Sequence, residues 1–385
     1  MTPSALQLKP RLSTPKNEGR SRTSRFLPAL ACASLLALPA FGAEETVRFI
    51  TLDPGHFHAG LVQKFMYPQV SPVVRVYTPG GAELQDHLAR IESFNTRADN
   101  PTHWQEKVYT GPDYLERMVQ EKAGNVVVIS GNNRRKTEYI DESIKAGLNV
   151  LADKPMAITP AGFTLLRQAC ETAAARHVLL YDIMTERYEI TTMLQRELAH
   201  SKAVFGSLQK GSPSEPAVVM ESVHHYFKEV AGKPLIRPAW FYDVRQQGEG
   251  IPDIGTHLVD GVNYICFPEQ SLSWKKDVKV FSAHRWPTII SPEQFRKTTA
   301  LESYPDYLKP DVGPDGSLRV FANGDVTYSV RGIHAKVTTL WRFEAPPGAK
   351  DTHYAIVRGT RANLVIEQGP AQKYLPILYV DNKSS

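Results

Sequence analysis

The stretch that decides the fold is Leu52-Asp53-Pro54-Gly55-His56-Phe57-His58-Ala59-Gly60, which completes the apolar, β-branched run 47–52. A short apolar run that ends in a Pro-Gly turn and continues at three- and four-residue apolar spacing indicates a strand, a tight turn and a helix. Gly55 lets the backbone of the turn come close to a neighbouring group, because it has no side chain. The stretch therefore predicts the first unit of an α/β fold.

The same alternation of strands and helices continues to about residue 180, which is typical of a parallel sheet with crossover helices. Strands are predicted at 47–52, 73–77, 126–130, 149–152 and 178–181. Helices are predicted at 58–65, 114–121, 136–146 and 160–175, the last of them with Thr159 as N-cap and Pro160 in its first turn. Residues 44–180 are thus predicted to form a Rossmann-like domain of the dinucleotide-binding type.

Beyond residue 180 the pattern changes to a helix at 188–199 followed by runs that alternate or carry β-branched residues. These runs predict strands at 217–227, 279–283, 318–321, 326–330, 335–343, 354–359 and 362–367. Such a series favours a broad, mainly antiparallel sheet. Residues 181–385 are therefore predicted to form an α+β domain that faces a substrate or another subunit.

Residues 1–43 resemble a signal peptide, with a basic start, an apolar run at 26–40 and small residues at 40–43. The apolar run is shorter than the roughly 20 residues that a transmembrane helix needs. We therefore expect cleavage near Gly42 or Ala43, an exported protein that is periplasmic or extracellular, and no stable membrane span afterwards. An uncleaved anchor and the route of export stay open.

The net charge argues against a nucleic-acid-binding protein, and the cysteines argue against a disulfide framework. The formal charge is +5, and residues 1–43 account for it with six basic residues and one acidic residue. The rest of the chain is formally neutral, so no nucleic-acid partner is expected. After the leader only Cys170 and Cys266 remain, each in an apolar helical pattern. Buried free thiols are expected there, although export leaves a single bridge between them open.

The turn after the first strand supplies the candidate cofactor-binding residues. In a dinucleotide-binding fold, glycines at this place let the backbone approach the pyrophosphate, which lies at the helix N-terminus. Gly55 matches the middle glycine of G-x-G-x-x-G, whereas Asp53 and His58 occupy the outer positions. A plain tight turn stays open as an alternative. The candidates are Asp53, Gly55, His56, Phe57 and His58, with Asn132 after the strand 126–130.

Two further motifs supply the candidate catalytic residues. Lys154, in Asp153-Lys154-Pro155, follows the strand 149–152 and is predicted to point at the crevice where ligands bind in such sheets. Asp253 and His257 lie four residues apart after a glycine-rich turn, which places them on one helix face. An imidazole can take a hydroxyl proton while a carboxylate orients it. A surface lysine and a purely structural Asp-His pair remain alternatives.

In this order, the D-K-P motif, the glycine-rich turn and the D-x-G-x-H-x-x-D motif resemble the Gfo/Idh/MocA family, named for glucose-fructose oxidoreductase and inositol dehydrogenase. The resemblance covers about residues 47–265, and the region beyond 270 resembles a secreted branch of the family. It implies that NAD or NADP takes a hydride from a sugar or polyol carbinol. Lys154 would contact substrate and cofactor, His257 would be the acid/base with Asp253 as its partner, and the protein would form a homo-oligomer.

The chain departs from the family pattern at three positions. Asp53 replaces the first glycine, Thr78 stands where an acid usually holds the ribose of NAD, and Lys136 stands where relatives commonly have His. These departures leave two other functions open. One is an NAD-dependent glycosidase that retains its cofactor, and the other is a non-catalytic carbohydrate-binding protein on the same scaffold.

No metal site is predicted, because the spacing of Cys and His residues matches no standard ligand pattern. His224 and His225 are adjacent on a predicted strand, so at most one of them can face the cleft. Trp240 and Tyr242 precede the glycine-rich turn, where they either stack on a sugar ring or pack in the core.

Overall fold

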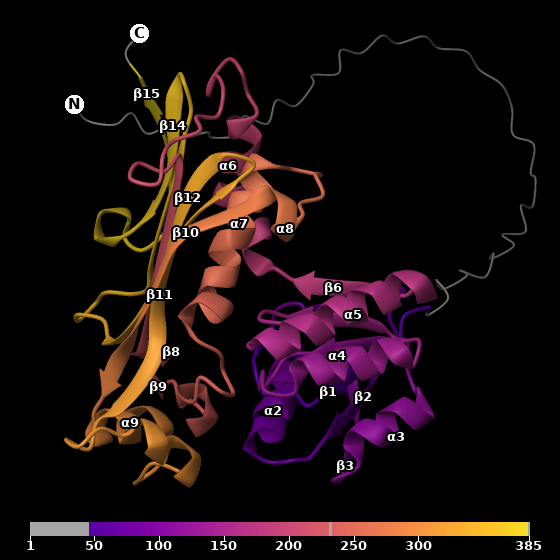
Figure 1. The fold of residues 1–385 in the computed structure, drawn as a ribbon. Coiled ribbons are helices and arrows are strands. Elements are labelled where there is room, and N and C mark those ends of the chain that lie inside the picture. The colour runs from indigo at the N-terminus through magenta and orange to yellow at the C-terminus, as the bar shows by residue number, and fades with distance from the viewer. Residues whose placement is uncertain (1–45, 231–232, 384–385) are drawn as a thin grey trace, which may run out of the picture.

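The computed structural model describes residues 46–230 and 233–383, so the predicted signal peptide at 1–43 lies outside the described residues. The chain forms two domains that lie side by side, each built on one large sheet (Figure 1). The first sheet has six parallel strands, and the second has seven mainly antiparallel strands. The predicted α/β fold with a parallel sheet followed by an antiparallel one is confirmed.

The first sheet has the strand order β3-β2-β1-β4-β5-β6, in which the order reverses between β1 and β4. Its strands are β1 (Phe49–Leu52), β2 (Val73–Thr78), β3 (Gln105–Thr110), β4 (Val126–Ile129), β5 (Asn149–Asp153) and β6 (Leu180–Ile183). Its helices are α1 (His58–Leu61), α2 (Ala82–Thr96), α3 (Tyr114–Glu121), α4 (Lys136–Lys145) and α5 (Pro160–Arg176). A reversal of this kind opens a crevice at the carboxyl ends of the strands, where ligands bind.

Three details of the first domain differ from the pattern read from the sequence. β3 and α2 were not predicted, because β3 is a polar edge strand with mostly exposed residues and α2 buries only Leu84, His87 and Ile91. The helix predicted at 58–65 ends at Leu61 after one turn. No side chain caps its N-terminus, so little stabilises a longer helix there. By contrast, Thr159 caps α5 as predicted, accepting a hydrogen bond from the Gly162 amide.

The second sheet has the strand order β10-β11-β12-β7-β13-β14-β15, with β12 and β7 parallel. Its strands are β7 (Val218–Phe227), β10 (Val278–Ile290), β11 (Leu318–Val330), β12 (Ile333–Glu344), β13 (Thr352–Arg358), β14 (Ala362–Gln368) and β15 (Ile377–Asn382), and β8 (Glu229–Val230) and β9 (Lys233–Pro234) form a separate hairpin. Its helices are α6 (Ile190–Ala199), α7 (Thr256–Cys266), α8 (Trp274–Asp277) and α9 (Pro292–Thr299). In Figure 1, α6 and α7 lie on the face of the sheet that turns toward the first domain.

The packing of the helices settles the state of both cysteines. Cys170 and Cys266 are free. Cys266 is buried in the core that α7 forms with the second sheet, as predicted, but Cys170 lies on the exposed side of α5, so the prediction of burial was wrong for it. Within the ranges 46–230 and 233–383, no helix combines the length and the apolar composition that crossing a membrane requires.

The turn after β1 packs directly against the turn after β4. The amides of Gly55 and His56 both donate to the carbonyl of Ser130, at 3.0 and 3.2 Å. A β-carbon added to Gly131 would lie only 2.3 Å from the carbonyl oxygen of Asp53. Glycine is required at this position because two backbones touch there.

Replacing Gly131 by Ala should therefore destabilise the first domain. We expect Gly131→Ala to lower the free energy of unfolding by about 2 kcal/mol or more, the scale of an overpacked site. The measurement is urea-induced unfolding followed by circular dichroism. Gly369→Ala is the matched control, since its new β-carbon would lie 3.4 Å from the flexible Gln372 side chain. Equal stability of the two variants would contradict the close approach of the two turns.

Candidate active site

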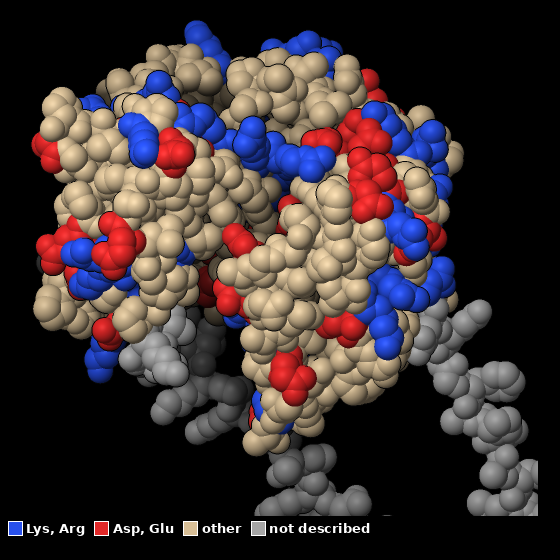
Figure 2. Space-filling view, turned by 90° about the horizontal axis from the view of Figure 1, so that it is seen from below, with Lys and Arg blue, Asp and Glu red and all other residues tan. Residues whose placement is uncertain are grey.

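A cavity of about 1110 Å³ lies between the two domains. Its wall includes the β1–α1 turn, the residue after β5, the first turn of α7 and the facing surfaces of β7 and β13. Figure 2 shows a face of the molecule that is hollowed between two lobes and on which basic and acidic residues are interspersed. The cavity thus occupies the crevice at the carboxyl ends of the parallel strands, where a ligand site is expected.

Most of the residues that the sequence analysis selected line this cavity, namely Gly55, His56, Phe57, His58, Lys154, Asp253 and His257. Two selected residues are placed elsewhere. The side-chain amide of Asn132 donates to Gln246 of the second domain at 2.8 Å. Asp53 has a φ of 46° and accepts a hydrogen bond from the Tyr139 hydroxyl at 2.8 Å. Burial raises the pKa of Asp53, and its carboxyl neither caps α1 nor lines the cavity.

Lys154 and Asp253 form an ion pair across the interface of the two domains. The Nζ atom of Lys154, just after β5, donates to Oδ1 of Asp253 at 2.7 Å, and both residues are less than a tenth exposed. Burial by itself raises the pKa of Asp253, but the ammonium of Lys154 outweighs it, so the pKa lies below its usual value. Asp253 is therefore an anion that holds Lys154 in place.

The structure pairs Asp253 with Lys154 and gives it no hydrogen bond to His257 within the part of the chain that is described. Asp253 belongs to a π-helical turn, Ile251–Gly255, that precedes α7, so the α-helical spacing assumed from the sequence does not hold between the two residues. Asp260, three residues beyond His257, accepts from Arg187 instead of facing the cavity. The imidazole thus reaches the cavity without a carboxylate of its own.

His257 is a neutral imidazole at the cavity wall. Burial and the nearby ammonium of Lys154 lower the pKa of His257 to about 3. Its Nδ1 atom is buried and has no hydrogen-bond partner among the residues described. His257 lines the cavity, and a neutral imidazole in a cavity wall can accept a proton from a bound hydroxyl.

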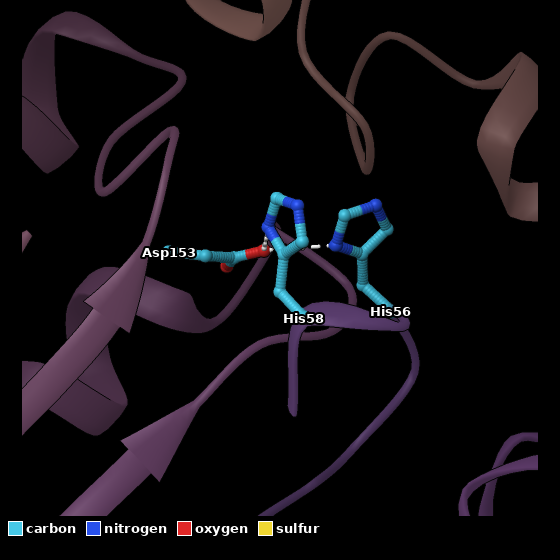
Figure 3. A group of neighbouring side chains, drawn as sticks. All are labelled: His56, His58 and Asp153. Atoms are coloured by element: carbon cyan, nitrogen blue, oxygen red, sulfur yellow. Dashed lines mark hydrogen bonds and ion pairs between the residues drawn. The ribbon is translucent and has the colours of Figure 1, made fainter. Parts of the chain in front are cut away.

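Asp153, the neighbour of Lys154, is a hub of hydrogen bonds inside the first domain. Its Oδ2 atom contacts Nδ1 of His56 at 3.0 Å and Nδ1 of His58 at 3.2 Å (Figure 3). Oδ2 also accepts from the Ser130 hydroxyl at 2.9 Å, and Oδ1 accepts from the ammonium of Lys136. Burial acts to raise the pKa of Asp153, yet Lys136 and the two imidazoles hold it well below its usual value.

Two imidazoles and a carboxylate in this arrangement lie close enough to hold a cation. The ammonium of Lys136 already neutralises the same carboxylate, however, and the cluster has no further anion to balance the charge of a metal ion. The cluster is therefore satisfied by protein groups. Lys136, which the sequence showed only as a departure from the family pattern, has the role of balancing the charge of Asp153.

A second polar wall, on the C-terminal sheet, was not identified from the sequence. Ser222 and His224 on β7 line the cavity with Asp351 and His353 at the start of β13, and His353 pairs with Ser222 in the sheet register. His224 contacts Ser222 at 2.8 Å and Asp351 at 3.2 Å. Period-two spacing would have placed each pair on one face of its strand. The pairing of strands about 130 residues apart in the sequence could not be read from it.

The structure also shows which of the two adjacent histidines, and which of the two aromatic residues before the glycine-rich turn, face the cavity. His224 lines the cavity and its neighbour His225 does not, although His225 also reaches Asp351 from the other side, at 3.0 Å. Trp240 lines the cavity, and its indole nitrogen donates to Glu83 of α2 at 3.0 Å. Tyr242 is buried in the core of the second domain. The indole of Trp240, in the second domain, thus contacts helix α2 of the first domain.

Comparison with known proteins identifies the family. Residues 60–181 match the model described as "Oxidoreductase family, NAD-binding Rossmann fold", and residues 194–385 match "Putative oxidoreductase C terminal domain". The crystal structure of "a putative oxidoreductase from Parabacteroides merdae ATCC 43184" has 54% identity, covers 89% of this chain and 78% of that chain, and has a TM-score of 0.87. The chain belongs to the Gfo/Idh/MocA oxidoreductase family.

More distant members of the structural group share the fold. The WlbA dehydrogenase from Bordetella pertussis, in complex with NADH and UDP-GlcNAcA, has 14% identity and a TM-score of 0.55, covering 89% of this chain and 82% of that chain. KijD10, a 3-ketoreductase from Actinomadura kijaniata in complex with TDP-benzene and NADP, has 13% identity and a TM-score of 0.52, covering 88% and 82%. No curated protein sequence matches the chain.

The residues of this Gfo/Idh/MocA protein fit a nicotinamide dinucleotide, with one change at the phosphate end. Lys154 and the neutral His257 suit the reactive end of the cofactor, because both line the cavity beside the end of β5. The family match begins at residue 60, after the turn. The turn amides of Gly55 and His56 are already used by Ser130, and α1 is a single turn with little dipole. Fewer amides of the turn are therefore available to a diphosphate, which would also meet the side chains of the turn.

Breaking the interdomain ion pair should destabilise this Gfo/Idh/MocA protein strongly. We expect Asp253→Asn or Lys154→Met to lower the free energy of unfolding by about 3 kcal/mol or more. Each substitution removes one member of the pair and leaves the other as a buried charge without a partner. The double variant Lys154→Met/Asp253→Asn should lose clearly less than the sum of the two single losses.

The cycle is measured by urea unfolding of the four proteins. The exposed pair Lys297–Glu344, at 3.0 Å with both side chains more than two-fifths exposed, is the matched control. Its coupling should stay below about 1 kcal/mol. Additive losses for Lys154 and Asp253 would show that the two domains are not held by this pair.

Proposed function

We propose that the protein is an exported NAD(P)-dependent oxidoreductase that removes a hydride from a CH–OH carbon of a sugar or polyol. The observation that carries the proposal is that an ammonium from the first domain and a neutral imidazole from the second line one cavity next to the end of β5. Membership of an NAD-binding oxidoreductase family supports the reaction class. The complexes of WlbA with NADH and UDP-GlcNAcA and of KijD10 with NADP support the kind of ligands.

When bound, the nicotinamide ring would supply the hydride acceptor, because that chemistry belongs to the cofactor. His257 receives the hydroxyl proton on an imidazole nitrogen. Its pKa of about 3 keeps the ring neutral and ready to accept, and the negative charge that develops on the substrate oxygen favours the protonated ring during the reaction. The ammonium of Lys154 stabilises the same developing charge. Asp253 keeps that ammonium aimed at the cavity.

The second polar wall suits a ligand rich in hydroxyl groups. Ser222, His224, Asp351 and His353 present donors and acceptors along the cavity, and Trp240 adds an aromatic surface. A few convergent polar groups in a largely apolar pocket fix the orientation of a small ligand. We therefore assign this wall to the hydroxyls of the substrate that do not react.

Export bears on how the cofactor is used. The leader at 1–43 would carry the protein out of the cytoplasm. Free dinucleotide is scarce outside the cytoplasm. We therefore infer that the protein retains its cofactor between turnovers.

The mature protein should consequently carry a dinucleotide when it is purified. The test records its absorbance at the reduced-nicotinamide band and identifies any released ligand by mass spectrometry, before and after addition of NAD and NADP. A protein that contains neither cofactor and binds neither one would sink the proposal and favour a non-catalytic carbohydrate-binding protein. A tightly held cofactor with hydrolysis of a glycoside and no net redox change would instead favour an NAD-dependent glycosidase.

Removing either proposed catalytic group should abolish most of the activity. We expect Lys154→Ala and His257→Ala each to lower kcat by about two orders of magnitude or more, the usual scale for a positioned acid or base. The measurement is change in nicotinamide absorbance with a panel of sugars, polyols and glycosides. His103→Gln, on an exposed residue outside the cavity lining, is the control. Wild-type activity in both alanine variants would end this assignment of roles.

A further inference from the structure

The turn that should hold the cofactor phosphates presents two imidazoles to the cavity, and two of its backbone amides are bonded to Ser130. His56 and His58 both line the cavity, and their ring centroids lie 4.3 Å apart. Each ring contacts the same oxygen of Asp153 through Nδ1. Figure 3 shows the Nε2 side of both rings turned away from Asp153, toward the chain of the second domain. The carboxylate thus sets the direction in which both rings face.

We propose that His56, with His58 beside it, binds the diphosphate of the dinucleotide as an imidazolium, so that cofactor and proton bind together. The proposal rests on the proposed function, since it needs a dinucleotide in this cavity. It adds to the usual contact of phosphate with backbone amides, because the amides of Gly55 and His56 are bonded to Ser130 here.

The proton is needed because of how the rings are held. A neutral ring that donates Nδ1–H to Asp153 leaves a lone pair on Nε2, which repels a phosphate oxygen. A protonated ring donates from both nitrogens and bridges the carboxylate and the phosphate. Charge-assisted hydrogen bonds of this kind are shorter and about twice as strong as neutral ones. An imidazolium between two anions is therefore the stable arrangement.

The charges around His56 determine whether cofactor affinity rises or falls with pH. The charged and titratable groups around the His56–His58 pair are Asp153 at the end of β5, Lys154 after it, Lys136 of α4, Glu186 before α6, Asp253 before α7 and His257 of α7. Burial outweighs the contact with Asp153 and lowers the pKa of His56 to about 4 without a ligand. A bound diphosphate favours the charged ring and raises that pKa. Cofactor affinity therefore rises as the pH falls through the raised pKa, and it levels off below about 4.

Arg90 of α2 also lines the cavity, and no ion pair of its guanidinium is found among the described residues. It is exposed, and its side chain lies over Gly60. A guanidinium stays charged at every pH in the range of interest. Arg90 can strengthen phosphate binding, but it cannot make that binding depend on pH. The two contributions are therefore separable by experiment.

The test measures dinucleotide affinity, not activity. Titration calorimetry of the full mature chain with NAD, NADP and ADP-ribose is carried out from about pH 8 to about pH 5.5, in buffers of different ionisation enthalpy. ADP-ribose carries the diphosphate without nicotinamide, whereas nicotinamide mononucleotide lacks the diphosphate. With NAD and ADP-ribose we expect uptake of up to one proton and up to about tenfold tighter binding per unit fall in pH. For NADP and the mononucleotide the ionisation of their own phosphate monoester, with a pKa of about 6, is subtracted, after which the mononucleotide should show no uptake.

His56→Gln should abolish both the proton uptake and the pH slope, because Gln can still donate to Asp153 but cannot be protonated. Arg90→Gln should weaken binding at every pH with an unchanged slope, and His103→Gln should change neither. Thermal unfolding of each variant shows whether the turn is intact. His56→Asn replaces His56→Gln if the latter does not fold, and His58→Gln shows whether the neighbouring ring carries the proton.

The outcomes separate this inference from the proposed function. Dinucleotide binding without proton uptake, or with the same slope in His56→Gln, overturns the imidazolium and leaves the oxidoreductase assignment standing. No binding of any dinucleotide at any pH overturns both. An unchanged slope with His58→Gln, together with a lost slope in His56→Gln, confirms His56 as the group that carries the proton.

Discussion

Two adjacent residues at the end of β5 connect the parts of this site, and the rest of the structure depends on how their charges are balanced. Asp153 turns back into the first domain and holds the β1–α1 turn, whereas Lys154 reaches across the interface to Asp253. Both groups are buried, so neither charge is stable without its partners. The strand end therefore fixes the cofactor turn and the domain interface at the same time.

This arrangement explains why the turn tolerates its departures from the glycine pattern. The amides of Gly55 and His56 are bonded to Ser130, and the carboxyl of Asp53 is held by Tyr139 outside the cavity. Neither group confronts a phosphate. What remains facing the cavity is a set of side chains, His56, Phe57 and His58, whose orientation Asp153 controls. The scaffold of the family is thus kept with a different set of side chains in the turn.

The two domains contribute different groups to the cavity. The first domain contributes the lysine and the turn, and the second contributes His257 on α7 and the polar wall of β7 and β13. A ligand between them is surrounded by groups from both. Because the ion pair of Lys154 and Asp253 spans the interface, holding the domains together and aiming the ammonium are one interaction.

The sequence alone determined the fold class, most of the strands and helices, the family and the lysine and histidine of the site, because these follow from local patterns and from motifs with fixed spacing. It missed α2 and β3, since their exposed, polar residues lack the periodicity of buried elements. Only the tertiary structure decided that Asp253 serves Lys154 and not His257, and that His224 and His353 share the cavity wall. Those relations depend on a π-helical turn and on strand pairing between distant segments, which no local pattern encodes.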